Sequence, residues 1–122
     1  MRPSLLLVED DKDIRDTLKD LLEEEGFEIA PAANGKAAAD FLDSTVVLPR
    51  LIFLDLSMPV MDGRQFRAWQ LAQDRYRGIP TYILSAAGNG GDEAARLSAA
   101  GFMRKPFDLD RLLELIRPYR ET

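Results

Sequence analysis

An α/β fold, with a parallel sheet covered by helices on both faces, is the fold class that this sequence predicts. Short apolar runs alternate with longer segments in which apolar residues recur every three or four positions. Five such strand-and-helix pairs fit within 122 residues, which is close to the commonest size of a single domain. Alternation of this kind forms a parallel sheet through right-handed crossovers, and an eight-stranded barrel would need about twice this length. We therefore expect residues 1–122 to form one domain.

The first strand is predicted at Ser4–Val8, a continuous apolar run followed by acids, as expected of a strand buried on both faces. The segment 11–25 carries apolar residues at i, i+4, i+7 and i+8, which predicts a helix. Gly26 follows at the position that favours a left-handed helix end. The second strand is predicted at Phe27–Ala30, and the next helix begins after Asn34, a favourable capping residue.

The middle of the chain continues the alternation. Leu51–Leu54 is apolar throughout and is predicted as the third strand. The segment Asp62–Arg75 is predicted as a helix with Phe66 and Trp69 facing inward. Thr81–Leu84 follows a glycine and a proline and is predicted as the fourth strand.

The last part of the chain supplies one more strand between two helices. A glycine-rich loop at 88–91 leads into a helix predicted at Asp92–Ala99, which Gly101 is expected to end. Phe102–Arg104 is predicted as the fifth strand, and Asp108 as the cap of the final helix. The final helix has apolar residues at i, i+3, i+4 and i+7, so one of its faces should pack on the sheet.

Composition excludes several classes of function. The chain contains no cysteine and no histidine, which rules out disulfides, thiolate or imidazole metal sites and histidine-based acid–base catalysis. Its net charge is -5, with 21 acidic against 16 basic residues, and a nucleic-acid-binding domain normally shows a basic face. The N-terminal apolar run is too short for a signal peptide or a membrane span. We expect a cytoplasmic protein that contacts neither nucleic acid nor membrane directly.

Polar residues follow the predicted strands at the edge of the sheet where ligands bind in open α/β folds. These residues are Glu9 and Asp10 after the first strand, Asp55 after the third, Ser85 after the fourth and Lys105 after the fifth. Two like charges about 4 Å apart repel by about 4 kcal/mol at an effective dielectric near 20. A cluster of three carboxylates therefore needs a cation. Oxygen ligands favour Mg²⁺, and a lysine adds a second compensating charge.

A site of this kind can hold a phosphoryl group during transfer, because a metal ion and a lysine neutralise the phosphoryl oxygens. Asp55 can then act as the nucleophile and form an acyl phosphate. Neighbouring polar residues have structural roles instead. Asp11 and Asp62 are predicted to cap helices, Gly63 to begin one, and the bond before Pro106 is a candidate for the cis form.

Four motifs carry a family resemblance that extends over essentially the whole chain. They are 6–11 (LLVEDD), 55–63 (DLSMPVMDG), 85–86 (SA) and 105–107 (KPF). With these motifs in this order, the chain resembles the receiver domains of two-component response regulators, of the stand-alone type. The resemblance implies a flavodoxin-like (βα)5 fold, a doubly wound parallel five-stranded sheet with strand order 2-1-3-4-5.

The resemblance also implies an acceptor and a metal site. Asp55 would take a phosphoryl group from the phosphohistidine of a histidine kinase or a histidine phosphotransfer protein. Mg²⁺ would be bound by Asp10 and Asp55, by Glu9 directly or through water, and by the backbone carbonyl of Ser57. Glu9 stands where the family more commonly has aspartate.

A switch is implied by the same resemblance. Ser85 would hydrogen-bond the phosphoryl group, Lys105 would pair with it, and Phe102 would be the aromatic residue that turns inward on phosphorylation. The family more often has threonine and tyrosine in place of Ser85 and Phe102. The face of the fourth helix, fifth strand and fifth helix would then change its preferred partner, a downstream effector protein. We expect a monomer or a weak phosphorylation-dependent dimer.

Two other functions compete with this switch. Phosphohydrolases of the haloacid-dehalogenase type also use an aspartyl nucleophile and Mg²⁺, but their D-x-D pattern requires an acid where this chain has Ser57. A purely structural module would not need all five of the site residues named above. We therefore predict a self-phosphorylating phosphoacceptor with autodephosphorylation, not a multiple-turnover enzyme. If the protein ends at residue 122, it is expected to act by protein contact or by passing the phosphoryl group to another histidine.

Overall fold

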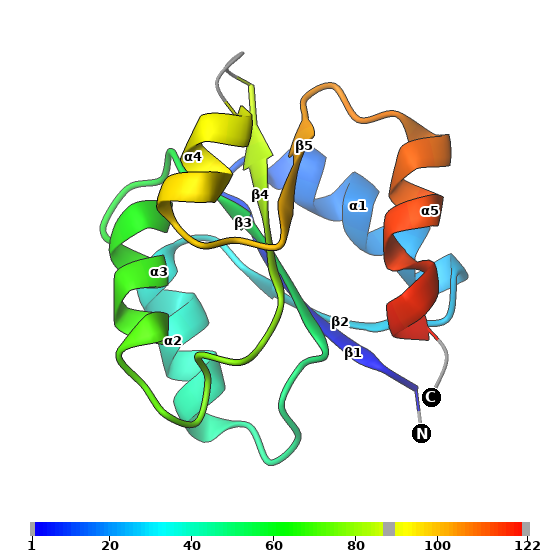
Figure 1. Cartoon of the computed structure of the whole chain (residues 1–122). Helices are drawn as coiled ribbons and strands as arrows, with labels where there is room; N and C mark the ends of the chain where they lie inside the picture. Colours follow the sequence, from blue (N-terminus) through cyan, green and yellow to red (C-terminus); the bar gives the residue numbers. More distant parts are fainter. Residues whose placement is uncertain (1, 87–89, 121–122) are drawn as a thin grey trace.

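The structure is a computed structural model that describes residues 2–86 and 90–120. Within these residues, five parallel strands form one sheet in the order β2-β1-β3-β4-β5 (Figure 1). The predicted fold class and strand order are confirmed. The predicted loop at 88–91 lies partly outside the described residues, since the description resumes at Gly90.

The strands are β1 (Ser4–Val8), β2 (Glu28–Ala32), β3 (Leu51–Asp55), β4 (Thr81–Ser85) and β5 (Gly101–Arg104). The helices are α1 (Lys12–Glu24), α2 (Gly35–Ser44), α3 (Gly63–Leu71), α4 (Gly90–Arg96) and α5 (Leu109–Arg120). Most bounds agree with the sequence-based ones within one or two residues.

Two predicted helices end earlier than expected. The helix α3 ends at Leu71. The side-chain amide of Gln70 donates to the backbone carbonyls of Tyr76 and Ile79, and these hydrogen bonds stabilise a non-helical turn after Leu71. The helix α4 ends at Arg96 because Ser98 takes a left-handed conformation (φ 52°). Gly101 is consequently the first residue of β5 and not the end of a helix.

The predicted helix caps are confirmed. Asp11 accepts hydrogen bonds from the first turn of α1, and Asn34 caps α2 in the same way. Asp62 and Gln65 form a reciprocal capping box at the start of α3. Gly26 has a φ of 100°, which glycine adopts without steric cost, so the turn from α1 into β2 uses the predicted residue.

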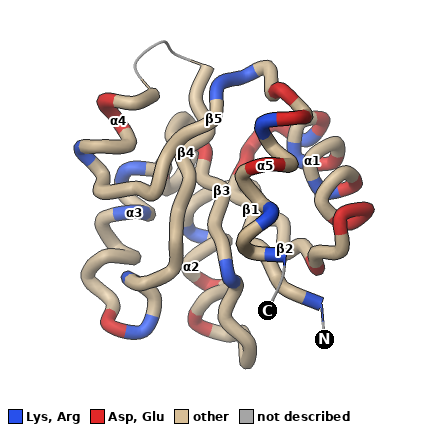
Figure 2. The backbone as a smooth tube through the Cα atoms, turned by 45° about the vertical axis from the view of Figure 1, so that its right-hand side comes forward, with Lys and Arg blue, Asp and Glu red and all other residues tan. Residues whose placement is uncertain are grey.

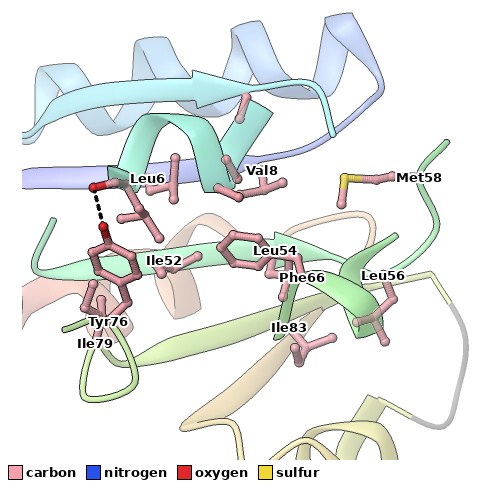
Figure 3. Packing of buried hydrophobic residues seen from close by; sticks show 14 of the residues in the cluster. Leu6, Val8, Ile52, Leu54, Leu56, Met58, Phe66, Tyr76, Ile79 and Ile83 are labelled. Atoms are coloured by element: carbon pink, nitrogen blue, oxygen red, sulfur yellow. Dashed lines mark hydrogen bonds between the residues drawn. The ribbon is translucent and has the colours of Figure 1, made fainter. Parts of the chain in front are cut away.

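Alternating residues of the central strands supply two separate cores. One core, under α2, α3 and α4, contains Leu6 and Ile52 and is shown in Figure 3. The Tyr76 hydroxyl closes it by donating to the Leu42 carbonyl at 3.0 Å (Figure 3). The other core, under α1 and α5, contains Leu5 and Phe53. Because both faces are covered, the carboxyl end of the sheet is the edge at which polar side chains converge.

No helix among the described residues is long and apolar enough to cross a membrane. In the view of Figure 2, basic positions are interspersed with acidic ones along the helices.

Candidate functional site at the carboxyl end of the sheet

A pocket of about 570 Å³ opens at the carboxyl end of β1, β3, β4 and β5. Six of the described residues that line it were predicted as site residues: Glu9, Asp10, Asp55, Ser57, Ser85 and Lys105. The pairing of the strands explains why they meet. Val8 lies beside Leu54 in the sheet and Ser85 beside Arg104, so the residues at these strand ends lie at the same level.

Three carboxyl groups form the acidic centre of the pocket. Glu9, Asp10 and Asp55 each place a carboxylate oxygen within 4.8 Å of the other two. Glu9 is fully buried and Asp55 is 6% exposed, whereas Asp10 is exposed to solvent. An all-oxygen donor set of this kind, with one side open for water, fits a small hard divalent cation such as Mg²⁺.

Lys105 places a positive charge beside two of these carboxyl groups. Its Nζ lies 2.6 Å from Glu9 Oε1 and 3.6 Å from Asp55 Oδ2. The Lys105 backbone amide donates to the Ser85 carbonyl at 2.8 Å, which ties the end of β5 to the end of β4. The Lys105–Pro106 bond, which the sequence left open as a candidate for the cis form, is cis.

In the absence of a cation, the environment of Asp55 makes its carboxyl group harder to ionise than an ordinary aspartate. Burial is the largest cause and, with the hydrogen bond and the charge of Glu9, it raises the pKa of Asp55 to about 7. The charge of Lys105 and the backbone N–H of Ser57, 3.3 Å from Asp55 Oδ1, act in the opposite direction. A divalent cation would make this ionisation easier, because it compensates both carboxylates at once.

The start of α3 packs directly against the backbone of Asp55. A Cβ at Gly63 would collide with the Asp55 carbonyl oxygen and with Leu56, and the Gly63 amide donates to the Leu56 carbonyl at 3.0 Å. Glycine is therefore required by close approach, in addition to the predicted role of Asp62 in starting the helix. The turn before it includes Val60 at a φ of 71°.

Two residues of the pocket were missed by the sequence analysis. Arg64, in the first turn of α3, places Nη2 2.9 Å from Oε1 of Glu93 in α4, and both residues line the pocket. The hydrogen bond between the two side chains raises the pKa of Arg64 and lowers the pKa of Glu93. No local pattern indicated this pair, because the two residues are 29 positions apart and meet only in the folded chain.

Phe102, the predicted switch residue, is not among the described residues that line the pocket. Its ring is partly buried and lies against the start of α4, where a Cβ at Gly90 would be 2.6 Å from Phe102 Cδ2. The absence of a side chain at Gly90 therefore leaves the space that the Phe102 ring fills. The switching role of Phe102 stays a prediction.

An apolar groove of about 560 Å³ adjoins the acidic pocket on the side of α1 and α5. It is lined by residues that include Thr17 and Leu21 of α1 and Phe107 before α5. Ile14 and Lys105 line both the groove and the acidic pocket, so the two cavities are contiguous.

Comparisons with known proteins agree on one family. The family model for the response regulator receiver domain matches residues 5–117. Response regulator Rre1 of Synechocystis sp. is 36% identical over 117 residues, which are 93% of this chain and 50% of that protein, so the chain spans about half its length. Sporulation initiation phosphotransferase F of Bacillus subtilis is 31% identical over 121 residues, 98% of this chain and 94% of that protein.

The fold has close counterparts among solved structures. Chemotaxis protein CheY4 of Vibrio cholerae superimposes with a TM-score of 0.85 at 26% identity, covering 98% of this chain and 99% of that one. The motifs, the strand order and these similarities lead to one conclusion. The chain belongs to the family of response regulator receiver domains.

Proposed function

We propose that this receiver domain, residues 1–122, is a phosphoacceptor switch of a two-component or phosphorelay system, and that Asp55 is the acceptor. The observation that carries the proposal is the position of the Asp55 carboxyl group. It is buried at a strand end, within 4.8 Å of two other carboxylates, with the Lys105 ammonium 3.6 Å away and a pocket open to an incoming phosphoryl group.

The reaction transfers a phosphoryl group from the imidazole of a phosphohistidine to Asp55. A carboxylate oxygen of Asp55 attacks the phosphorus, a P–O bond forms, and the P–N bond of the donor breaks with its electron pair left on the imidazole nitrogen. Lys105 pairs with a phosphoryl oxygen, and Ser85, which lines the same pocket, donates a hydrogen bond to another. The product is an acyl phosphate.

Receiver domains bind Mg²⁺ at an acidic pocket, and the donor set found in this chain fits that ion. We assign Asp10, Asp55, Glu9 and the Ser57 carbonyl as the groups that would hold it. The bound ion would neutralise charge on the phosphoryl oxygens during transfer. A bound cation would also favour the ionised form of Asp55, which is the form that acts as the nucleophile.

The chain is suited to store one phosphoryl group and not to process many substrate molecules. It has no histidine or cysteine, and Ser57 occupies the position at which an acid would serve as general acid–base in a haloacid-dehalogenase-type hydrolase. Water therefore attacks the acyl phosphate without a dedicated base. The result is autodephosphorylation, which resets the switch.

The expected partners follow from this chemistry. The donor is a histidine kinase or a histidine phosphotransfer protein, and the readout is a downstream effector protein that distinguishes the two states. We infer a cytoplasmic protein that is a monomer or a weak dimer when phosphorylated, with no direct contact to nucleic acid or membrane. Size-exclusion chromatography with and without a phosphodonor tests the oligomeric state.

The acceptor is tested by incubating the protein with Mg²⁺ and acetyl phosphate. We expect a mass increase of one phosphoryl group that is lost in Asp55→Asn and retained in Asp20→Asn, a matched change on the exposed face of α1. A mass increase in Asp55→Asn would contradict the assignment. Steady release of phosphate from a small phosphomonoester would favour the phosphohydrolase instead.

The groove on α1 is proposed as the place where the histidine-bearing donor docks, because it adjoins the pocket that the phosphohistidine must enter. Thr17→Arg inserts a charged side chain into this groove at an exposed position. We expect it to slow transfer from the protein donor at least tenfold and to leave phosphorylation by acetyl phosphate unchanged. Ala37→Arg, an equal change of charge at an exposed position of α2, is the control. Equal slowing by both variants would place the docking surface elsewhere.

A further inference from the structure

An ion pair between α3 and α4 forms part of the wall of the phosphoacceptor pocket. Arg64 Nη2 lies 2.9 Å from Glu93 Oε1, and Arg96 Nη1 lies 3.6 Å from the same oxygen. The Glu93 side chain is largely buried, whereas the Arg64 side chain is 51% exposed. The guanidinium of Arg64 is thus the movable partner, on a long side chain with solvent beside it.

The reach of Arg64 is set by the residue before it. Gly63 is in close contact with the Asp55 carbonyl oxygen, so the first turn of α3 cannot move away from the acceptor without breaking that packing. Arg64 follows directly and lines the same pocket as Asp55. Its position relative to Asp55 is therefore fixed at the backbone and adjustable only at the side chain.

Arg67, one turn further along α3, is buried, whereas the Arg64 side chain is half-exposed. Arg67 is 4% exposed, and its guanidinium donates to the carbonyls of Leu97 and Ser98 and to the side chains of Gln70 and Thr81. Because Arg67 is buried and is not among the described residues that line the pocket, a phosphoryl group on Asp55 gives it no competing partner. The helix α3 therefore holds the segment that follows α4 through Arg67 and the middle of α4 through Arg64.

The charges lining the pocket decide what Arg64 does when a phosphoryl group arrives. Among the described lining residues, the acidic side chains are Glu9, Asp10, Asp11, Asp55 and Glu93, and the basic ones are Arg64 and Lys105. A phosphoryl group adds about two negative charges at neutral pH. Its oxygens match the two-pronged guanidinium better than a single carboxylate oxygen does.

We propose that Arg64 is a phosphoryl-binding residue, and that its guanidinium leaves Glu93 for the phosphoryl oxygens when Asp55 is phosphorylated. This inference rests on the proposed function, since it requires a phosphoryl group on Asp55. Glu93 then keeps only the longer contact to Arg96 within its own helix. The middle of α4 then loses its contact with Arg64 of α3, while Arg67 still holds the carbonyls that follow α4.

The exchange is tested with beryllofluoride, a stable mimic of the phosphoryl group, titrated in the presence of Mg²⁺ and followed by calorimetry. We expect Arg64→Gln to bind it about tenfold more weakly, because a hydrogen bond between charged groups is lost. Glu93→Gln should bind it about threefold more tightly, because the competing partner of Arg64 is removed. A pair with a purely structural role would shift both variants in the same direction.

A double variant separates direct exchange from a general effect of charge. If Arg64 moves from one partner to the other, Glu93→Gln has no effect in the Arg64→Gln background. If only the field of the charges matters, the two effects add, and the proposal is overturned. Arg96→Gln removes the same charge from the other partner of Glu93 at an exposed position outside the pocket lining, and it should stay within twofold of the wild type.

The outcome for the wild type separates this inference from the proposed function. Failure of the wild-type protein both to bind beryllofluoride and to gain mass with acetyl phosphate would refute the proposed function. Normal wild-type binding together with unchanged binding by Arg64→Gln would refute only the role of Arg64. Circular dichroism of each variant confirms that the comparison is made between folded proteins.

Discussion

At the scale of single residues, two requirements on the ionisation of the Asp55 carboxyl group oppose each other. The proposed phosphoryl transfer needs it ionised, while burial and the neighbouring Glu9 raise its pKa to about 7. Lys105, 2.6 Å from Glu9 Oε1, compensates part of this charge, and a divalent cation would compensate more. Without the cation the site is expected to be a source of instability near neutral pH.

This instability has a definite sign. Because the pKa of Asp55 in the folded protein lies above its ordinary value of 3.8, the folded state binds more protons than the unfolded state between these values. The raised pKa of Asp55 therefore contributes stability that is fully present below about pH 4 and is lost as the pH rises through about 7. In EDTA, Asp55→Asn should therefore gain stability over the wild type between pH 5 and pH 8. We expect on the order of 1 kcal/mol, since the pocket is open to solvent and the repulsion is screened.

Urea unfolding of both proteins at several pH values measures this effect. The control is Asp20→Asn on the exposed face of α1, whose difference from the wild type should not follow the same trend. A difference between Asp55→Asn and the wild type that does not change with pH would contradict the prediction.

A second residue-scale prediction concerns backbone strain beside the site. Val60 has a φ of 71° and is 77% exposed, so it bears the cost of a left-handed conformation with a β-branched side chain and little burial in return. Val60→Gly should raise the free energy of unfolding by about 1 kcal/mol. Thermal unfolding measures it, with Val46→Gly as the control at an exposed residue without a left-handed φ. A lower free energy of unfolding in Val60→Gly would contradict the prediction and show that the Val60 side chain makes a stabilising contact.

At the scale of elements, Arg67 connects α3, β4 and the end of α4. Its donors satisfy the carbonyls that follow α4 and the side chains of Gln70 and Thr81. Burial lowers the pKa of Arg67, and the oxygens that accept its hydrogen bonds are neutral carbonyl, amide and hydroxyl groups. Such a network makes the position of α4 depend on one side chain.

Replacing Arg67 by methionine keeps the apolar stem and removes every donor. We expect a loss of about 3 kcal/mol in the free energy of unfolding, because the hydrogen bonds of the buried guanidinium to the Leu97 and Ser98 carbonyls and to the side chains of Gln70 and Thr81 are all lost. Arg64→Met in the same helix is the matched control and should cost less than about 1 kcal/mol, since the Arg64 side chain is half-exposed and Glu93 keeps its contact to Arg96. Chemical denaturation of both variants gives the comparison, and equal losses would mean that burial of Arg67 matters less than its contacts suggest.

At the scale of the whole molecule, the acidic centre joins the last residue of β3 to the two residues that follow β1. A cation that binds there binds only the folded chain, because Glu9, Asp10 and Asp55 are brought together by the sheet. Mg²⁺ at about 100 times its dissociation constant should add about 2.7 kcal/mol to the stability at neutral pH. The midpoint of thermal unfolding should rise with Mg²⁺ concentration in the wild type.

Asp10→Asn should abolish most of this rise, because it removes an exposed carboxylate of the centre without altering the buried pair. Asp20→Asn should retain it. Equal Mg²⁺ dependence in Asp10→Asn and the wild type would remove Asp10 from the proposed ligand set.

The architecture was predictable because its determinants are local and periodic. The apolar run of β1, the capping residues Asp11 and Asp62, and Gly26 each specify a strand, a helix start or a turn from neighbours only a few positions away. The strand order followed from the family resemblance. The predicted ends of α3 and α4 were wrong, since they depend on Gln70 and Ser98, whose roles are set by contacts and conformation in the folded chain.

The sequence by itself determined the fold class, the family and the set of polar residues that end the central strands, because periodicity, turn chemistry and motif spacing are properties of the chain. Only the tertiary structure decided that Glu9 is fully buried beside Lys105, that Gly63 packs on the Asp55 carbonyl, and that Arg64 meets Glu93. These contacts join residues far apart in the sequence. The distances between the residues and the burial of their side chains depend on how the helices pack on the sheet.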